Sequence, residues 1–209
     1  MKLRVKICGM RDPLNIEGIG QLKPDLMGFI LYPPSPRFVD ERLLGEALSH
    51  VPNGISSVAV FVNETNESVV RICKLYGFAY AQLHGNESAA DCHTIHEAGI
   101  YVIKTFPVSD SIDFEALKAY EPYVDFFLFD TKTPRYGGSG KKFDWSLLMA
   151  YPFQTPYFLS GGIGHSDMET IQNTRLPGMA GIDVNSRLEI TPGLKDLQAA
   201  ANLINQLRK

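Results

Sequence analysis

Two residues at the ends of apolar runs could move a proton in this 209-residue sequence. Cys8 ends the run Leu3–Cys8, and Asp130 ends the run Asp125–Asp130. A thiol with an ordinary pKa of about 8.5 can act as a base, and a carboxyl group that follows four apolar residues can be desolvated enough to donate a proton. The alternatives are structural, because a free cysteine is often a small buried side chain and a strand-end aspartate often caps a loop.

An anion site is predicted further along the chain. Two glycines follow the run Pro156–Ser160, and a short polar stretch closes the run Met179–Val184. Glycine allows backbone N–H groups to approach phosphate oxygens, and the start of a short helix adds partial positive charge. Glycines that only make a turn are the alternative. The predicted phosphate-binding residues are Gly161, Gly162, Asp183, Asn185 and Ser186.

Histidines offer one site candidate and one weak metal motif. His84 follows the run Ala79–Leu83 and is a candidate for substrate binding, although it could equally order its loop through a hydrogen bond. Cys92 and His96 have the spacing of two ligands on one helix face. They fall in a predicted outer helix without a third or fourth ligand, so we predict no metal site.

Eight short apolar runs alternate with segments of helical character. The runs are Leu3–Cys8, Leu26–Leu31, Ser56–Val62, Ala79–Leu83, Ile100–Thr105, Asp125–Asp130, Pro156–Ser160 and Met179–Val184. The helical segments are Pro13–Leu22, Glu41–His50, Ser68–Tyr76, Ser88–Ala98, Phe114–Tyr120, Trp145–Ala150, Ser166–Asn173 and Leu194–Leu207. This alternation predicts an α/β fold with a parallel sheet, and eight units predict a (βα)8 TIM barrel in one domain spanning residues 1–209. An open, doubly wound sheet is the alternative.

Barrel enzymes carry their active sites at the carboxyl ends of the strands. This rule places Cys8, His84, Asp130 and the paired glycines at one mouth. The first and sixth strands lie three steps apart around a ring of eight, so Cys8 and Asp130 are predicted to face each other across it.

The composition limits the partners. Twenty Lys and Arg residues against 23 Asp and Glu residues give a formal net charge of -3, which offers no field for nucleic acid or an anionic membrane. No segment approaches the roughly 18 continuous apolar residues of a membrane span. The odd number of cysteines, three, argues against a disulfide framework, and the expected location is the reducing cytoplasm.

Segment 131–142 follows Asp130 directly and is rich in glycine and basic residues. It is predicted to act as a lid that excludes water, with a plain flexible linker as the alternative. It matches neither a Walker A loop nor a dinucleotide-binding fingerprint, because Arg135 and Phe143 stand where those motifs need glycine.

Together these residues stand in motifs that closely resemble the phosphoribosylanthranilate isomerase family over essentially the whole chain. The motifs are Lys6-Ile7-Cys8-Gly9, Ser35-Pro36-Arg37-Phe38-Val39, Val60-Phe61-Val62-Asn63, Gln82-Leu83-His84-Gly85, Phe129-Asp130, the stretch 137–145, Leu159-Ser160-Gly161-Gly162, Asp183-Val184-Asn185-Ser186 and the stretch 192–196. Two positions depart from the family. Ser139 stands where Thr is usual, and Arg187 replaces a common Gly, which affects the expected geometry of the phosphate loop but not the reaction.

The resemblance implies an Amadori rearrangement in tryptophan biosynthesis that needs no metal or organic cofactor. It implies that Cys8 is the general base, that Asp130 is the general acid and that Arg37 meets the anthranilate carboxylate of a small phosphorylated aminosugar. Two alternatives are kept: an isomerase that also accepts the analogous aminoaldose of histidine biosynthesis, and a barrel that binds a phosphorylated ligand without turnover. Both a monomer and a homodimer fit the sequence.

Overall fold

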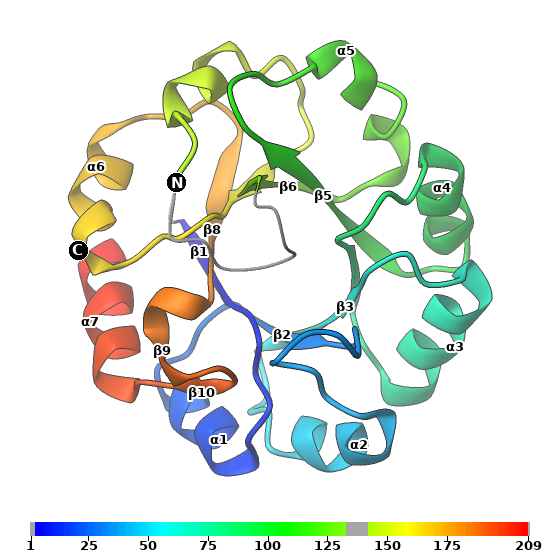
Figure 1. Ribbon diagram of the computed structural model, residues 1–209, viewed down its shortest axis with the longest axis vertical. Coiled ribbons are helices and arrows are strands. Elements are labelled where there is room, and N and C mark those ends of the chain that lie inside the picture. The colour runs from blue at the N-terminus through cyan, green and yellow to red at the C-terminus, as the bar shows by residue number, and fades with distance from the viewer. Residues whose placement is uncertain (1–2, 133–141, 209) are drawn as a thin grey trace.

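The computed structural model describes residues 3–132 and 142–208, which form a closed barrel of eight parallel strands surrounded by helices (Figure 1). Each strand pairs with the next along the chain, and β1 pairs with β8 to close the ring. The strands are β1 (Arg4–Ile7), β2 (Leu26–Ile30), β3 (Ser56–Phe61), β4 (Tyr80–Leu83), β5 (Tyr101–Val108), β6 (Phe126–Thr131), β7 (Tyr157–Leu159) and β8 (Met179–Val184). The predicted barrel is confirmed, and each of the eight predicted runs overlaps one of these strands.

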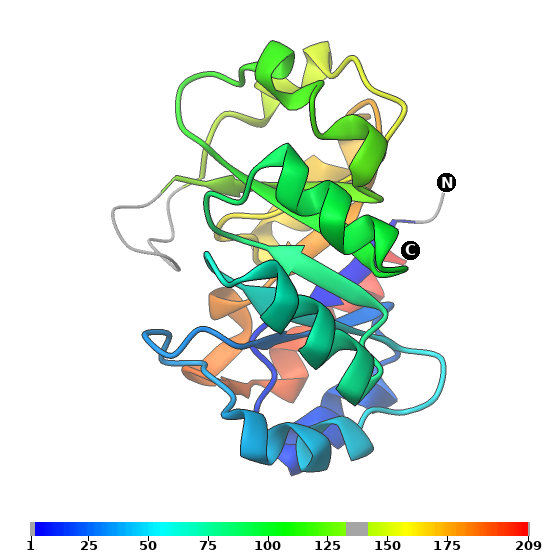
Figure 2. The same cartoon turned by 90° about the vertical axis from the view of Figure 1, so that its right-hand side faces the viewer.

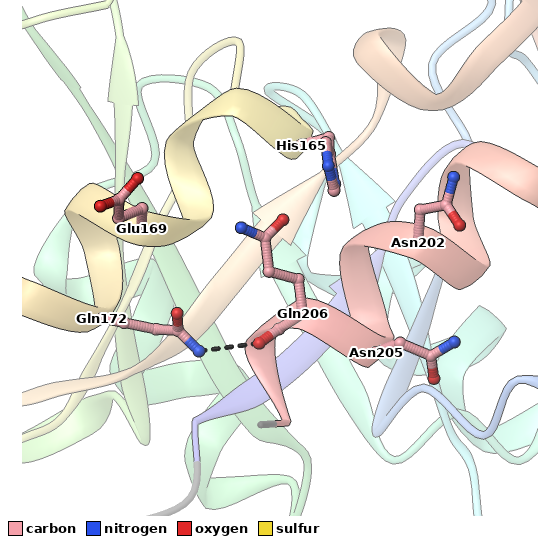
Figure 3. Close-up of a pocket in the computed structure, with 6 residues that line it drawn as sticks. All are labelled: His165, Glu169, Gln172, Asn202, Asn205 and Gln206. Atoms are coloured by element: carbon pink, nitrogen blue, oxygen red, sulfur yellow. Dashed lines mark hydrogen bonds between the residues drawn. The ribbon is translucent and has the colours of Figure 1, made fainter.

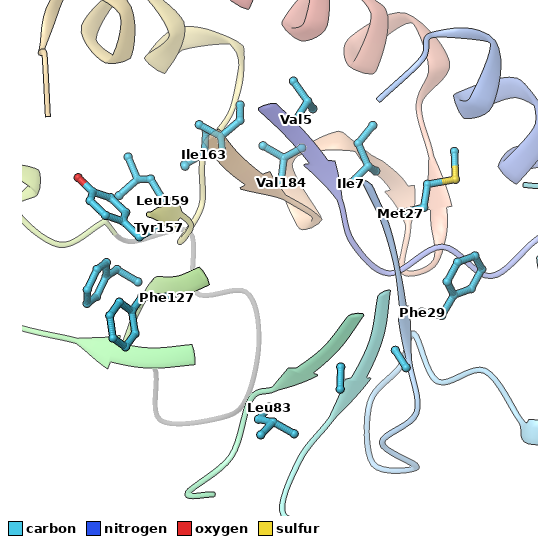
Figure 4. Packing of buried hydrophobic residues seen from close by; sticks show 14 of the residues in the cluster. Val5, Ile7, Met27, Phe29, Leu83, Phe127, Tyr157, Leu159, Ile163 and Val184 are labelled. Carbon is cyan, nitrogen blue, oxygen red and sulfur yellow. The ribbon is translucent and has the colours of Figure 1, made fainter. Parts of the chain in front are cut away.

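Side chains alternate between the barrel interior and an outer layer along each strand. On β6, Phe126 and Leu128 belong to the apolar cluster inside the barrel, whereas Phe127 and Phe129 pack in the cluster beneath the helices. Figure 4 shows members of that outer cluster, most of them on strands of the barrel. Because the period is two, Asp130 lies on the same inward face as Phe126 and Leu128.

Helices cover the outside of the barrel (Figure 1). The α-helices are α1 (Pro13–Gln21), α2 (Glu41–Ser49), α3 (Asn66–Tyr76), α4 (Ala89–Glu97), α5 (Phe114–Leu117), α6 (Met168–Asn173) and α7 (Leu197–Leu207), and the 3₁₀ helices are η1 (Glu121–Tyr123), η2 (Trp145–Ala150), η3 (His165–Asp167) and η4 (Ser186–Leu188). The predicted start of α1 is confirmed, since Asp12 accepts the Asn15 N–H at 2.8 Å and Pro13 is the first helical residue. The segment Trp145–Ala150, predicted to be helical, is a 3₁₀ helix.

The final helix differs from its prediction. The apolar pattern predicts a helix over Leu194–Leu207, but α7 begins at Leu197 because Asp196 caps it there by accepting N–H groups of the first turn. Residues 194–195 instead form β10, which pairs antiparallel with β9 (Glu189–Thr191). The resulting β9–β10 hairpin is inserted between β8 and α7.

Loops that follow the strands gather at one end of the barrel, which we call the mouth. In Figure 2 the loop 31–39, in blue, and the β9–β10 hairpin, in orange, both lie on that side. Residues 133–141, nearly all of the predicted lid, fall outside the described residues. Within the part of the chain that the structure describes, no helix combines the length and apolarity needed to cross a bilayer.

Candidate active site

Cys8 lies directly after β1 at the mouth and is almost fully buried, with 4% of its surface exposed. Its N–H donates to the Val184 carbonyl at 2.9 Å, which carries the β1–β8 pairing one residue further. Gly28 on β2 makes room for the thiol, because a β-carbon at that position would lie 2.8 Å from Sγ. Gly28 was not predicted as a site residue, since its need for a missing side chain depends on a neighbouring strand.

Lys6 and Asp183 form a buried ion pair next to Cys8. Lys6 Nζ lies 2.9 Å from Asp183 Oδ1, and the two side chains are 0% and 6% exposed. Burial by itself would lower the pKa of Lys6, but the negative charges of Asp183 and of an ionised Cys8 outweigh it, so the pKa of Lys6 is raised. Lys6 is therefore a fixed cation beside the thiol.

The pKa of the Cys8 thiol is raised above its ordinary value by burial, which disfavours the thiolate. The adjacent Lys6 charge acts in the opposite direction. Burial thus favours the protonated thiol, and Lys6 is the group that stabilises the thiolate when it forms.

The structure disfavours the phosphate-binding role predicted for Asp183. Its carboxylate points into the barrel and pairs with Lys6. A carboxylate carries the same sign of charge as phosphate and has no N–H or O–H to donate, so this side chain is unsuited to hold that anion. It is a neighbour of Cys8, reached through Lys6.

His84 and Asp130 come together at the mouth from β4 and β6. His84 Nε2 and Asp130 Oδ2 lie 3.5 Å apart, and both side chains are partly exposed. Gln82, on the same face of β4, places Nε2 2.9 Å from His84 Nδ1. With the amide N–H donated to Nδ1, His84 carries its own proton on Nε2, on the side of Asp130. Gln82 was not predicted, although a polar residue at an inward position of a strand is a signal for such a role.

The cluster around Cys8 and the His84–Asp130 pair face the same barrel interior. Burial is the main cause that raises the pKa of Asp183, and the charge of Asp130 raises it further. Asp130 therefore lies within electrostatic reach of the carboxylate that pairs with Lys6. The structure brings Cys8 and Asp130 to the same mouth.

The loops after β7 and β8 meet there as well. Gly161 and Gly162 have φ values of 97° and 69°, a left-handed backbone that favours glycine. A β-carbon on Gly161 would lie 2.7 Å from Thr131 N, so the loop passes tightly over the end of β6. A β-carbon on Gly164 would lie 3.4 Å from the Arg187 β-carbon. The two loops predicted to bind phosphate are thus neighbours.

Other residues fix these loops. Asp167 accepts the Gly164 N–H at 2.8 Å and forms an ion pair with Lys142. Ser186 begins η4, and Asn185, which precedes it, accepts a hydrogen bond from Lys195 Nζ to Oδ1 at 2.6 Å. The predicted phosphate residues Asn185 and Ser186 therefore sit where β8 gives way to a short helix.

Arg37, the predicted carboxylate ligand, is held by a residue that sequence reasoning missed. Its Nε and Nη2 atoms donate to Glu189 on β9, with Nη2 2.6 Å from Oε2. Gly9 lies against the stem of Arg37, because a β-carbon there would lie 2.8 Å from Arg37 Cδ. Arg37 thus passes beside the backbone that follows Cys8.

Two features of the described residues lie away from the mouth, a buried cysteine on α4 and a polar groove on the outer wall. Cys92 is fully buried on α4, and the described residues contain no group of three or more His, Cys, Asp or Glu side chains that could hold a metal ion. A polar groove lies on the outer wall between α6 and α7, where Gln172 Nε2 donates to the Gln206 carbonyl at 2.7 Å (Figure 3). The groove is lined mainly by side-chain amides and does not include any predicted site residue.

Comparison with known proteins agrees with this geometry. Residues 5–206 match the family model of N-(5'-phosphoribosyl)anthranilate (PRA) isomerase. A protein of Parabacteroides distasonis named N-(5'-phosphoribosyl)anthranilate isomerase is 48% identical over 205 residues, which cover 97% of this chain and 92% of that protein. The homologue of the same name from Phocaeicola vulgatus is 40% identical, with 98% of each chain covered.

Solved structures show the same likeness. The crystal structure of phosphoribosyl anthranilate isomerase from Thermotoga maritima superposes with a TM-score of 0.88 at 34% identity and covers 98% of both chains. A second isomerase structure, in complex with reduced 1-(o-carboxyphenylamino)-1-deoxyribulose 5-phosphate, has a TM-score of 0.84 at 30% identity, with 98% of both chains covered. The sequence, the barrel and the arrangement of its mouth agree: the chain belongs to the N-(5'-phosphoribosyl)anthranilate isomerase family.

Proposed function

We propose that the mouth of the barrel converts N-(5'-phosphoribosyl)anthranilate to 1-(2-carboxyphenylamino)-1-deoxyribulose 5-phosphate with Cys8 as the base and Asp130 as the acid. As a member of its family, the chain is an isomerase of tryptophan biosynthesis. The observation that supports the residue roles is the convergence of Cys8 and Asp130, from strands on different sides of the ring, on one interior.

The first step belongs to the acid. Asp130 donates a proton to the ribose ring oxygen, the C1'–O bond breaks, and the nitrogen lone pair forms a Schiff base with C1'. Asp130 must carry a proton for this step, and His84 orients its carboxyl group from 3.5 Å away. The alternative is that Asp130 only caps its loop. That role explains Oδ1, which accepts the Thr131 N–H, but it does not explain why Oδ2 faces His84.

The second step belongs to the base. The Cys8 thiolate removes the C2' proton, and the electrons of that C–H bond move into the iminium to give an enolamine. The enolamine tautomerises, with a new C–H bond at C1' and loss of the proton from the C2' hydroxyl, to the ketone. Hydrogen is rearranged within one molecule and the iminium supplies the carbon acidity, so the reaction requires no nicotinamide, flavin or metal.

The remaining contacts bind the two ends of the substrate. The turn at Gly161 and Gly162, with Asn185 and Ser186 in the adjacent loop, would hold the phosphate through N–H and O–H donors. Arg37 would meet the anthranilate carboxylate, because a guanidinium offers a planar fork that matches that group. A related structure at 30% identity holds a reduced product with both of these functional groups, which supports the proposal.

The experiment is a fluorescence assay of the purified chain with freshly prepared N-(5'-phosphoribosyl)anthranilate. We expect consumption of the substrate by the unmodified protein and by Cys73→Ala, a control that removes another buried free thiol. Tight binding of the reduced product without any turnover would instead identify a barrel that only binds its ligand. Assay of the analogous aminoaldose of histidine biosynthesis in parallel distinguishes an enzyme with two substrates.

The proposal extends to the setting of the enzyme. Cys8, Cys73 and Cys92 are all free and buried, which fits the reducing cytoplasm. A related isomerase from Thermotoga maritima is described as dimeric, so we keep a homodimer beside a monomer, and size-exclusion chromatography with light scattering distinguishes them.

A further inference from the structure

The β9–β10 hairpin buries charges that the proposed reaction does not use. Glu189 on β9 and Lys195 on β10 have side chains only 4% and 0% exposed. Burying a charge is costly unless it is paired, so these two residues need an explanation. We infer that Glu189, anchored by Lys195, is a positioning residue that holds Arg37 so that its free edge faces the aryl carboxylate of the substrate. This inference rests on the proposed function, since it takes Arg37 as the ligand of that carboxylate.

Glu189 occupies one edge of the Arg37 guanidinium. Arg37 Nε lies 2.9 and 3.0 Å from the two carboxylate oxygens of Glu189, and Nη2 lies 2.6 Å from Oε2. A guanidinium has five N–H donors in one plane, and this contact uses the edge formed by Nε and one Nη2 hydrogen. The second edge, formed by Nη1 and the other Nη2 hydrogen, has no hydrogen bond to any described residue. That edge has the geometry for a second carboxylate.

Lys195 anchors Glu189, and its side chain is fully buried. Its ammonium group lies 2.8 Å from Glu189 Oε1, 2.6 Å from Asn185 Oδ1 and 3.4 Å from the Asn185 carbonyl. An ammonium has three N–H donors, and these contacts occupy all of them. Glu189 Oε1 also accepts the Gly193 N–H at 3.0 Å. The acceptor for Arg37 is thus fixed by Lys195 on β10 and by the turn that joins β9 to β10.

The same contacts link the two ends of the proposed substrate site. Asn185 immediately precedes η4 in the predicted phosphate loop, and Lys195 holds it together with Glu189. A β-carbon at Gly9 would lie 2.7 Å from Asn185 Oδ1 and 2.8 Å from Arg37 Cδ. The residue after the thiol therefore lies between the carboxylate ligand and the phosphate loop, which sets the spacing between them.

The charge of this cluster matches the substrate. Arg37 and Lys195 are cations and Glu189 is an anion, so the buried cluster has a surplus of one positive charge. Burial lowers the pKa of Lys195, and the nearby Arg37 charge acts in the same direction. An incoming carboxylate would neutralise the surplus, whereas a substrate without that group would leave it uncompensated.

The test compares two ligands. The first is reduced 1-(o-carboxyphenylamino)-1-deoxyribulose 5-phosphate, and the second is the same molecule with an unsubstituted phenyl ring. The selectivity ratio is the Kd of the phenyl ligand divided by the Kd of the carboxyphenyl ligand, both measured by calorimetry, and it reports the contribution of the carboxylate alone. We expect Glu189→Gln to lower this ratio about tenfold, the loss for one charged hydrogen bond, because the Kd of the carboxyphenyl ligand rises while that of the phenyl ligand changes less than twofold.

The competing explanations give different results. Glu189→Gln makes the cluster more positive, so a purely electrostatic role would tighten the binding of the carboxylate ligand, and that result would overturn the inference. An equal rise in the Kd values of both ligands would also overturn the inference, because a general disturbance of the hairpin weakens the binding of both. Glu189→Asp keeps the charge but is one methylene shorter, and we expect it to lower the ratio of the two Kd values at least threefold. This second variant decides the question if the first does not fold.

A matched control and the wild-type protein complete the experiment. Glu41→Gln removes an exposed ion pair with Arg71 on the outside of the barrel, and we expect an unchanged ratio. A wild-type protein that binds both ligands equally would overturn the proposed role of Arg37 and this inference with it. Wild-type selectivity retained in both Glu189 variants would overturn the inference alone.

Discussion

Lys6 Nζ pairs with Asp183 Oδ1 at 2.9 Å inside the barrel, although 177 positions separate the two residues in the chain. The same ammonium group lies beside the Cys8 thiol. A buried thiol is a poor base on its own, because its thiolate has lost the solvation of water. Lys6 supplies a fixed countercharge for the thiolate, and Asp183 keeps Lys6 charged while the thiol is neutral.

Replacement of either proton-transfer group tests the proposed mechanism. General acid–base groups contribute about 10²- to 10⁴-fold in rate, so we expect Cys8→Ala and Asp130→Asn each to lower kcat by at least about 100-fold. Binding of the reduced product should stay within about threefold of wild type, because the phosphate loops and Arg37 are unchanged. Steady-state kinetics and calorimetry measure the two quantities, and near-normal turnover in either variant would refute its role.

The Cys8 thiol itself should ionise only at high pH. Burial raises the pKa of this thiol above its ordinary value. Below that pKa the thiolate fraction rises about tenfold per pH unit, so the thiolate of Cys8 should still be increasing from pH 7 to pH 9 without a plateau in that window. The difference in ultraviolet thiolate absorbance between the wild-type protein and Cys8→Ala measures it directly, independently of the protonation of Asp130. A thiolate signal that is already complete at pH 7 would contradict a raised thiol pKa.

Loss of one partner of the Lys6–Asp183 pair should destabilise the protein. Lys6→Met leaves a carboxylate buried without its cation, and such changes cost about 3–5 kcal/mol. We expect the free energy of unfolding, measured in urea, to fall by that order. The double variant Lys6→Met/Asp183→Leu removes both charges and should recover most of the stability. It should nevertheless lack activity, because Cys8 would have no neighbouring cation, and full activity in the double variant would refute the role given to Lys6.

Gly28→Ala tests the space beside the thiol. Its new methyl group would lie 2.8 Å from Cys8 Sγ and 3.1 Å from Lys6 Nζ, so the sulfur must move. A displaced base loses alignment with C2', and we expect kcat to fall at least about tenfold. Gly45→Ala on α2 is the matched control, since its methyl group would meet only Tyr76 Cε1 at 3.9 Å. The control should keep full activity and gain a little helix stability. Equal kinetics in both variants would show that the contact at position 28 is unimportant.

The fold and the main site residues could be predicted because their signals are local or periodic. Eight apolar runs separated by helical segments define the barrel, and a position at a strand end is enough to bring Cys8, His84 and Asp130 to the mouth. The alternation of β6 also fixes the inward direction of Asp130. These arguments need no knowledge of which strands touch.

The remaining site residues could not be predicted because their roles depend on long-range contacts. Glu189 looks like a surface residue of a loop until Arg37 is seen beside it. Lys195 fits the polar face of a predicted helix, but Asp196 starts that helix later and leaves Lys195 in a strand. Asp183 was placed with the phosphate residues by its position in a motif, whereas its inward direction on β8 pairs it with Lys6.

Closure of the ring between β1 and β8 also dictates when an active molecule can exist. Lys6 is synthesised 177 positions before Asp183, its counter-ion. A nascent chain that stops before residue 183 exposes the edge of β1 and has an unpaired cation beside its thiol. We therefore expect such a chain to be inactive until β8 has been made and has docked against β1.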